Sequence, residues 1–285
     1  MTLPRSLLVF YDGSESSRSG LAFAVRLAAT TKAELTLAHV IAPEAGFLDG
    51  LPANEGEAEG WLDTAVKESG AHQSAHVERL VLEANKPAEA IVALSEECDA
   101  DLTVVGRSGA GGVRRYMIGS CAERLIEHAP SSVAVFPPES ASHPLLNVVV
   151  GYDGSAYASE ALSQGEALAS ALALPLQVIH VVKLQLPYPT DIGLESYGSL
   201  LRRHGQELLE EAQAQVDKVD GVALRDGDPR HSLVELAKEQ PGALIVLGYR
   251  GVGGFIGLRL GSTSWELARR STGPVLIAKS RPAER

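Results

Sequence analysis

Two glycine-rich segments hold the residues of this sequence whose types and spacing suit ligand chemistry. "GRSGAGGVRRYMIGSC" begins at Gly106 and "GYRGVGGFIGLRLGST" begins at Gly248; each reads Gly, two residues, Gly, nine residues, Gly-Ser. A helix N-terminus offers unpaired amides and about half a positive charge, and glycine lets an anion approach the backbone because it lacks a Cβ. A helical stretch follows each Gly-Ser. The segments therefore predict two phosphate sites, and the alternative is a pair of glycine-rich turns.

The local charge of these segments favours an anion. The chain has a net charge of −11, yet Arg107, Arg114 and Arg115 face no acidic residue within the first segment, and Arg250 and Arg259 are likewise unopposed in the second. Positive charge concentrated in an otherwise acidic chain attracts anionic ligands.

An aspartate follows the first apolar run of each half, Asp12 in "VFYDGS" and Asp153 in "VGYDGS". Ligands of open α/β sheets lie beyond the carboxyl ends of the strands, so these carboxylates should face the glycine segments. There they could accept hydrogen bonds from ribose hydroxyls. A turn aspartate that precedes glycine fits the residues equally well.

Short apolar runs alternate with longer amphipathic stretches along the chain. Runs such as "SLLVFY" and "LTVV" are too short for helices and too apolar for half-exposed strands, so they predict buried parallel strands. The pattern recurs about 142 residues later, on both sides of a predicted linker, "PPESASHP". We therefore expect an α/β protein of two tandem Rossmann-like domains, residues 1–140 and 145–285. Each should have an open, parallel, five-stranded sheet in flavodoxin-like order with helices on both faces.

The last apolar run of each half, "SVAVF" or "PVLIA", is expected to be a sheet edge. Exposed apolar edges invite association, and a duplicated chain carries two copies of one surface. The halves should therefore pack together as an intramolecular pseudo-dimer. Further pairing of whole chains into a homodimer stays open.

Composition and charge indicate which classes of partner this protein can bind and in which compartment of the cell it works. A net charge of −11 should repel nucleic acid. No segment approaches the ~20 apolar residues that span a bilayer, and the N-terminal apolar run is too short for a signal peptide. The two cysteines, Cys98 and Cys121, suggest neither a disulfide framework nor a zinc site. We expect a cytoplasmic protein without nucleic acid, membrane or protein-bound metal.

Three further residues could have a functional role, and each also has a structural interpretation. His39 and His180 each end a second strand, where a packed, hydrogen-bonded histidine is favoured over a metal ligand. Cys121 follows Ser120 in the predicted first helical turn, where the helix dipole could lower a thiol pKa and create a redox sensor. A small residue packed under the loop is the favoured reading.

Together with "YDGS" at the first strand, the glycine spacing resembles the ATP-binding branch of the universal stress protein family, and the resemblance covers nearly the whole chain twice. It implies ribose near Asp12 or Asp153 and adenine against the backbone at Val40 or Val181. The phosphate-binding residues that it implies are Gly106, Gly109, Gly119 and Ser120 in the first half and Gly248, Gly251, Gly261 and Ser262 in the second. Mg²⁺ would accompany ATP, held mainly by the phosphates.

Two classes of function fit this resemblance. The first is a binding module in a stress response, in which ATP occupancy sets the conformation or the surface offered to a protein partner. The second is a slow ATPase or phosphotransferase that uses the same loops. The module is favoured because neither loop contains a carboxylate, histidine or glutamine to position the attacking group. We accordingly predict no catalytic residue. The sequence also lacks the G-x-x-x-x-G-K-S/T loop of P-loop NTPases and the G-x-G-x-x-G turn that follows the first strand of dinucleotide-binding folds. It has no G-x-S-x-G elbow of the kind that serine hydrolases use.

Overall fold

The computed structural model describes residues 3–42, 51–52, 54–70, 76–109, 117–183, 194–252 and 260–280. The elements of the first half are β1 (Ser6–Phe10), α1 (Glu15–Thr31), β2 (Glu34–Ile41), α2 (Glu55–Glu68), β3 (Val77–Glu83), α3 (Pro87–Glu97), β4 (Leu102–Gly106), α4 (Ser120–His128) and β5 (Ser132–Phe136). The 3-10 helix η3 (Pro138–Ser142) follows. The elements of the second half are β6 (Asn147–Gly151), α5 (Ala156–Leu172), β7 (Leu176–Val182), α6 (Leu194–Gln215), β8 (Gly221–Asp226), α7 (Pro229–Glu239), β9 (Ala243–Gly248), α8 (Ser262–Arg270) and β10 (Val275–Ala278).

The local sequence explains why the first helix of each half begins where it does. Ser14 and Ser155 have extended backbone and accept hydrogen bonds from the amides of Ser17 and Ala158, so each serine caps α1 or α5. The strands before them are buried because helices cover both faces of the sheet. The predicted alternation of buried strand and amphipathic helix is confirmed.

The strands form one ten-stranded sheet in the order β3-β2-β1-β4-β5-β10-β9-β6-β7-β8. All pairs within each half are parallel. The expected Rossmann-like fold is confirmed, but the flavodoxin-like order was wrong in detail: β1 lies between β2 and β4, the arrangement of a Rossmann half. The two sheets also merge instead of remaining separate.

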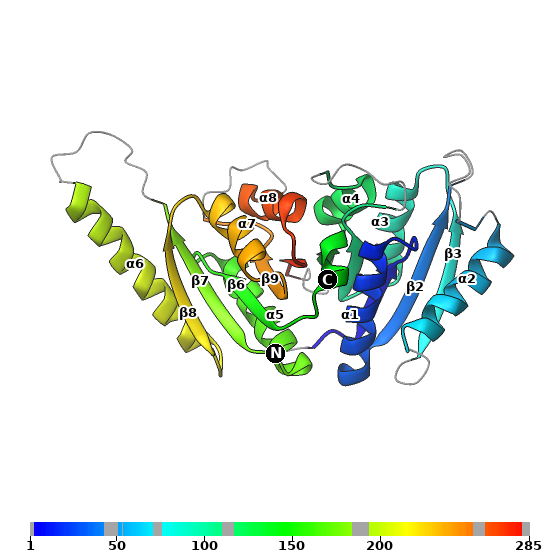
Figure 1. The fold of residues 1–285 in the computed structure, drawn as a ribbon, viewed down its shortest axis with the longest axis horizontal. Coiled ribbons are helices and arrows are strands. Elements are labelled where there is room, and N and C mark those ends of the chain that lie inside the picture. Colours follow the sequence, from blue (N-terminus) through cyan, green and yellow to red (C-terminus); the bar gives the residue numbers. More distant parts are fainter. Residues whose placement is uncertain are drawn as a thin grey trace.

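The halves meet through their last strands, as the predicted pseudo-dimer requires. β5 and β10 pair antiparallel, with Val133 opposite Ile277 and Val135 opposite Val275. Figure 1 shows the two halves side by side, with α2 and α6 at the outer ends and α4 and α8 near the middle. Because each edge strand covers the other, neither exposes its backbone hydrogen-bonding groups there.

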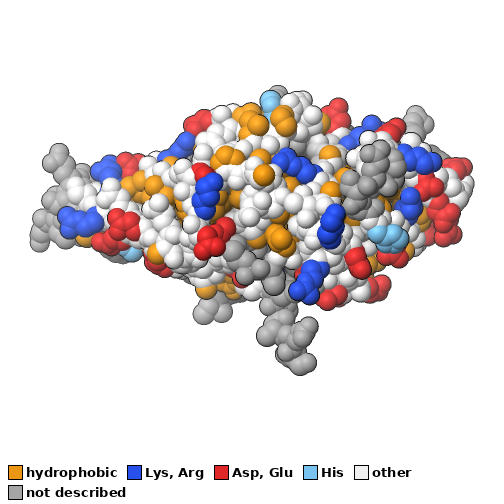
Figure 2. Space-filling view, turned by 90° about the horizontal axis from the view of Figure 1, so that it is seen from below, with side chains coloured by type: hydrophobic (Ala, Val, Ile, Leu, Met, Phe, Trp, Pro, Cys, Tyr) orange, Lys and Arg blue, Asp and Glu red, His pale blue; other side chains and the backbone are white. Residues whose placement is uncertain are grey.

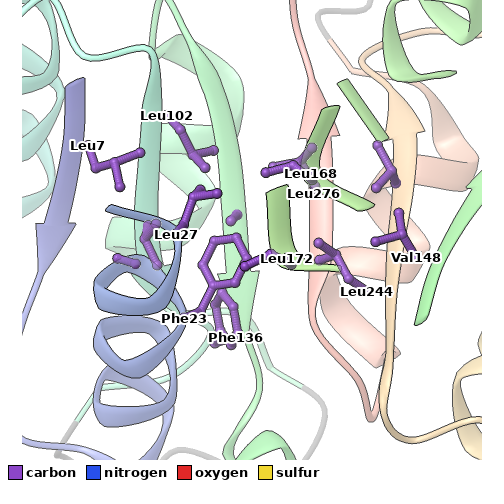
Figure 3. Packing of buried hydrophobic residues seen from close by; sticks show 14 of the residues in the cluster. Leu7, Phe23, Leu27, Leu102, Phe136, Val148, Leu168, Leu172, Leu244 and Leu276 are labelled. Atoms are coloured by element: carbon purple, nitrogen blue, oxygen red, sulfur yellow. The ribbon is translucent and has the colours of Figure 1, made fainter. Parts of the chain in front are cut away.

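Two hydrophobic cores lie on opposite faces of the sheet. One includes Leu21, Leu62, Leu162 and Leu209, from α1, α2, α5 and α6; the other is formed with α3, α4, α7 and α8. The first core continues across the junction, where the rings of Phe23 and Phe136 lie 5.2 Å apart (Figure 3).

Charged side chains dominate the outer end of the first half. Figure 2 shows acidic side chains gathered at the end of the molecule that α2 occupies in Figure 1. Helix α2 buries Ala58, Leu62, Ala65 and Val66 against the sheet, which leaves its carboxylates toward solvent. Within the described part of the chain, no helix is both long and apolar enough to cross a bilayer.

Lys279, directly after β10, joins the two halves. Its Nζ donates to the carbonyl of Ala129 at 2.6 Å and lies 4.7 Å from the centre of the Tyr249 ring. Burial lowers the pKa of Lys279 to about 8.

The first half expressed without the second should associate with itself. Removing β10 exposes the apolar edge of β5, and a second copy offers the same edge in the antiparallel direction. Light scattering on residues 1–143 should show dimers or larger species over a concentration series. A monomer at high concentration would contradict the role given to this edge.

The pKa of Lys279 predicts a pH dependence of stability. Between pH 8 and 10.5 the unfolded chain keeps a proton that the folded chain has released, so folding becomes more favourable as pH rises. Relative to Lys279→Met, the parent should gain about 1–3 kcal/mol in unfolding free energy over this window, since one pKa unit corresponds to ~1.4 kcal/mol. Urea unfolding of both proteins near the two ends of the window measures this. A difference that stays flat or falls would contradict it.

Candidate functional site

A cavity opens in the second half at the carboxyl ends of β6 and β9, where the strand order reverses. Its volume is ≈ 560 Å³, within the range of small-molecule sites. The six residues of the second half that the family resemblance assigns to the ligand all line it: Asp153, Val181, Gly248, Gly251, Gly261 and Ser262. Residues separated by about a hundred positions thus converge because parallel strands end at one edge.

One end of the cavity is the N-terminus of α8. Gly261 is the N-cap, and among the described residues no side chain caps this helix, in contrast to Ser155 on α5. The Gly261 amide donates to the carbonyl of Tyr249 at 2.9 Å. The amides of Ser262, Thr263 and Ser264 precede the first intrahelical hydrogen bond, which the Trp265 amide donates to the Gly261 carbonyl, so this end of the cavity can hold an anion.

The glycines of the motif have distinct packing requirements. A Cβ on Gly248 would lie 2.5 Å from the carbonyl oxygen of Tyr157 in α5, and one on Gly251 would collide with Asp153. A Cβ on Gly261 would lie only 3.4 Å from the Tyr249 oxygen. The first glycine therefore lets the strand approach α5, a role that the sequence analysis did not assign to it.

Asp153 combines both roles that its sequence position left open. Its Oδ1 accepts from the amide of Ser155 at 3.1 Å, as a turn aspartate does. Its Oδ2 accepts from the amide of Val252 at 3.0 Å and so holds the glycine segment against the turn that follows β6. The carboxylate is part of the cavity wall.

The other end of the cavity is apolar, with a charged rim. Ile179, Val181, Pro229, Leu233 and Leu247 contribute apolar surface. The sequence analysis missed the rim residues Lys183, Asp228 and Arg230, which also line the cavity.

Asp228 organises this rim. It caps α7 and accepts hydrogen bonds from Arg230 Nε at 2.9 Å and Nη2 at 2.7 Å, and these bonds lower the pKa of the Asp228 carboxyl. The signal that could have revealed it is "GDP", a capping residue before a proline at the first helical position. In the first half, Lys86 stands at the equivalent N-cap.

The first half repeats the backbone of the site. Gly119 is the N-cap of α4, also without a capping side chain among the described residues, and its amide donates to the Arg107 carbonyl at 2.7 Å. Ser120 is the first helical residue. A Cβ on Gly109 would lie 3.0 Å from Asp12 Oδ2, and one on Gly106 would lie 2.8 Å from the Ser16 Cβ.

The remaining predicted residues of the first half keep equivalent places. Asp12 Oδ1 accepts from the amide and the hydroxyl of Ser14, so the turn role of this aspartate is present. Val40 is half-buried near the end of β2.

The expected cationic role of Arg107 was wrong. Its side chain is only 3% exposed; it donates to the carbonyl of Ser271 in the other half and, at 3.1 Å, to Glu139. Arg250 lines the cavity as a phosphate-facing cation would. Arg114, Arg115 and Arg259 lie outside the described residues.

The structure agrees with the interpretation of His39 and His180 as hydrogen-bonded strand residues and of Cys121 as a small residue packed under the loop. The Nδ1 atoms of His39 and His180 are hydrogen-bonded to the carbonyls of Tyr11 and Tyr152 at 2.8 and 2.7 Å, and burial lowers the pKa of His39. No cluster of three or more metal-ligating side chains occurs in the described ranges. Burial raises the pKa of the Cys121 thiol, which is opposite to the lowered pKa that the redox-sensor hypothesis requires.

Fold and site define a tandem, doubly wound α/β protein with a cavity at a switch point of the sheet. The model of the universal stress protein family matches residues 4–137 and 145–279, and the chain belongs to this family.

Similar proteins have the same tandem length. A universal stress protein of Mycolicibacterium smegmatis is 30% identical over 289 residues, covering 96% of this chain and 97% of the relative. One from Mycobacterium tuberculosis H37Rv is 26% identical over 294 residues, covering 95% and 99%.

Solved structures share the fold. A universal stress protein from Archaeoglobus fulgidus is 21% identical with a TM-score of 0.62, over 96% of this chain and 98% of that one. A functionally unknown protein from Pseudomonas aeruginosa PAO1 is 14% identical with a TM-score of 0.73, over 98% and 93%.

Substitution by alanine should separate packing glycines from ordinary ones. Gly248→Ala should destabilise the protein by about 1–3 kcal/mol, because its Cβ meets the Tyr157 backbone. Gly60→Ala, in the exposed interior of α2 where a Cβ meets nothing within 4 Å, should stabilise it by about 0.5–1 kcal/mol. Urea unfolding compares both with the parent. Equal effects at the two positions would refute the packing role of Gly248.

Proposed function

We propose that this protein binds ATP at equivalent sites in both halves and acts as a nucleotide-responsive binding module in a stress response. The cavity of ≈ 560 Å³ in the second half carries the proposal, since it combines an uncapped helix N-terminus at one end with an apolar wall at the other. That polarity matches a molecule with a phosphate chain at one end and a flat apolar base at the other.

Each part of ATP has suitable partners along the cavity. Ile179, Val181 and Leu233 offer apolar surface for adenine, and the backbone at Val181 is where the family resemblance expects the base. Asp153 lines the cavity beside Gly251 and Val252 and can accept hydrogen bonds from ribose hydroxyls.

The phosphates would lie at the uncapped end. Gly251, Gly261 and Ser262 line that end, and the amides of the first turn of α8 can donate to phosphate oxygens. Arg250 adds positive charge. Mg²⁺ would be held mainly by the phosphates themselves.

In the first half, the equivalent phosphate residues are Gly106, Gly109, Gly119 and Ser120, with Asp12 for ribose and Val40 for adenine. The rims of the two sites differ, because Asp228 and Arg230 in the second half replace Lys86 and Ala88. We therefore expect the two sites to differ in affinity.

Binding is favoured over catalysis at these sites. Phosphoryl transfer needs a group that positions or deprotonates the nucleophile. Asp153, the carboxylate at the glycine segment, already accepts from two backbone amides, so both of its oxygens are engaged in holding the turn and the glycine segment. An ATPase or phosphotransferase activity at these loops is the alternative, and sustained ATP turnover well above about one per second would favour it over a binding module.

Proline at the first helical residue tests the phosphate sites without disturbing the helix. Ser120→Pro and Ser262→Pro each delete one amide donor. The preceding glycines have φ of −72° and −67° with ψ of 151° and 142°, which suits a residue before proline. Helices α3 and α7 already begin with proline at this position.

Calorimetric titration with Mg·ATP should give about two sites in the parent and should show one weakened site in each proline variant. A hydrogen bond to a charged group contributes about 1.5–3 kcal/mol, which corresponds to a loss of about tenfold or more. Ser120→Ala and Ser262→Ala, which keep the amide, are the matched controls and should lose less. If a folded double proline variant binds ATP with parental affinity, the assignment of the phosphate sites is wrong.

A further inference from the structure

Two side chains cross from one half to the other at equivalent positions of the glycine motifs. Arg107 follows Gly106, and Tyr249 follows Gly248. Arg107 donates through Nη1 to the carbonyl of Ser271, the C-cap of α8. The Tyr249 hydroxyl donates at 3.2 Å to the carbonyl of Glu127, in the last turn of α4. Figure 1 shows α4 and α8 on the two sides of the junction that these contacts span.

The backbones of the same two residues hold the opposite ends of their own helices. The Arg107 carbonyl accepts from the amide of Gly119, the N-cap of α4, at 2.7 Å. The Tyr249 carbonyl accepts from the amide of Gly261, the N-cap of α8, at 2.9 Å. Each residue therefore connects the N-terminus of one helix to the C-terminal end of the other.

These contacts close a ring. From the N-cap of α4, the ring runs through Arg107 to the C-cap of α8 and then along α8 to its N-cap. From there it runs through Tyr249 to the last turn of α4 and returns along α4 to its N-cap. Both helices have nine residues and move as rigid bodies on this scale. A displacement at either helix N-terminus is thus transmitted to the other.

The Arg107 crossing is buried, the Tyr249 crossing is half-buried, and both are reinforced by further contacts. Arg107 is 3% exposed and is also held by Glu139 of η3. Lys279 donates to the carbonyl of Ala129, the C-cap of α4, and its Nζ lies over the Tyr249 ring. Arg107 and Lys279 thus place positive charge at the negative ends of the two helix dipoles.

We propose that Arg107 and Tyr249 are positioning residues that couple the two sites, so that ligand bound at one helix N-terminus raises the affinity of the other. This inference rests on the proposed function, with ATP as the ligand. The first ATP restrains one helix N-terminus and, through the ring, orders the other. The second ATP then loses less conformational entropy on binding, which makes the coupling positive.

Calorimetry with Mg·ATP measures the coupling directly. Ser262→Pro reports the intrinsic affinity of the first site and Ser120→Pro that of the second, at ATP concentrations too low to fill the weakened site. In the parent, the second ATP should bind at least about five-fold more tightly than these intrinsic values predict, the lower end of typical coupling factors. Tyr249→Phe, introduced into all three proteins, should lower the factor while leaving the intrinsic affinities unchanged, and Tyr249→Phe combined with Glu139→Gln should bring it below about two-fold because both crossings are then weakened.

Tyr197→Phe, the same chemical change in α6, is the matched control and should keep the full factor. Glu139→Gln removes the carboxylate partner of Arg107 and so weakens the Arg107 crossing. It should lower the coupling factor, as Tyr249→Phe does. Hydrogen exchange gives a readout that a merely structural role would not move. ATP bound only at the second site of Ser120→Pro should slow exchange of the α4 amides, and Tyr249→Phe should reduce the slowing.

The outcomes separate this proposal from the function on which it rests. A parent that binds no ATP overturns both. Two bound ATP molecules with affinities within two-fold of the intrinsic values overturn the coupling and leave the binding intact. Full coupling retained in both Tyr249→Phe and Glu139→Gln overturns the roles given to the two crossings.

Discussion

The antiparallel pairing of β5 with β10 is the constraint on which the rest of this structure depends. Both strands are fully buried, and their pairing turns two five-stranded sheets into one sheet of ten strands. It brings the C-terminal ends of α4 and α8 within reach of side chains from the opposite half. The crossings made by Arg107, Tyr249 and Lys279 all follow from this one edge-to-edge contact.

The glycine motif meets two demands at once. Its first glycine allows β4 or β9 to pack against the first helix of its own half, and its second lies against the carboxylate that follows the first strand. Its last glycine begins a helix without a capping side chain. Only the last feature is directly suited to an anion, so the motif couples helix packing to the shape of the ligand site.

Duplication preserved the backbone of the two halves and changed side chains around it. Arg107 and Tyr249 occupy one equivalent position and differ in chemistry, yet both reach the last turn or the C-cap of a helix in the opposite half. The rim residue Asp228 holds Arg230 where the first half has Lys86. A symmetric scaffold therefore carries two sites with different electrostatic surroundings.

The sequence by itself determined the duplication, the alternation of strands and helices and six of the residues that converge on the cavity, because each of these follows from local spacing or from where parallel strands end. It could not determine that β1 lies between β2 and β4, nor that Arg107 turns away from the glycine loop to meet Ser271, 164 residues along the chain. Strand order and the partner of a buried charge depend on contacts between distant segments, and only the packed tertiary structure decides which of them form.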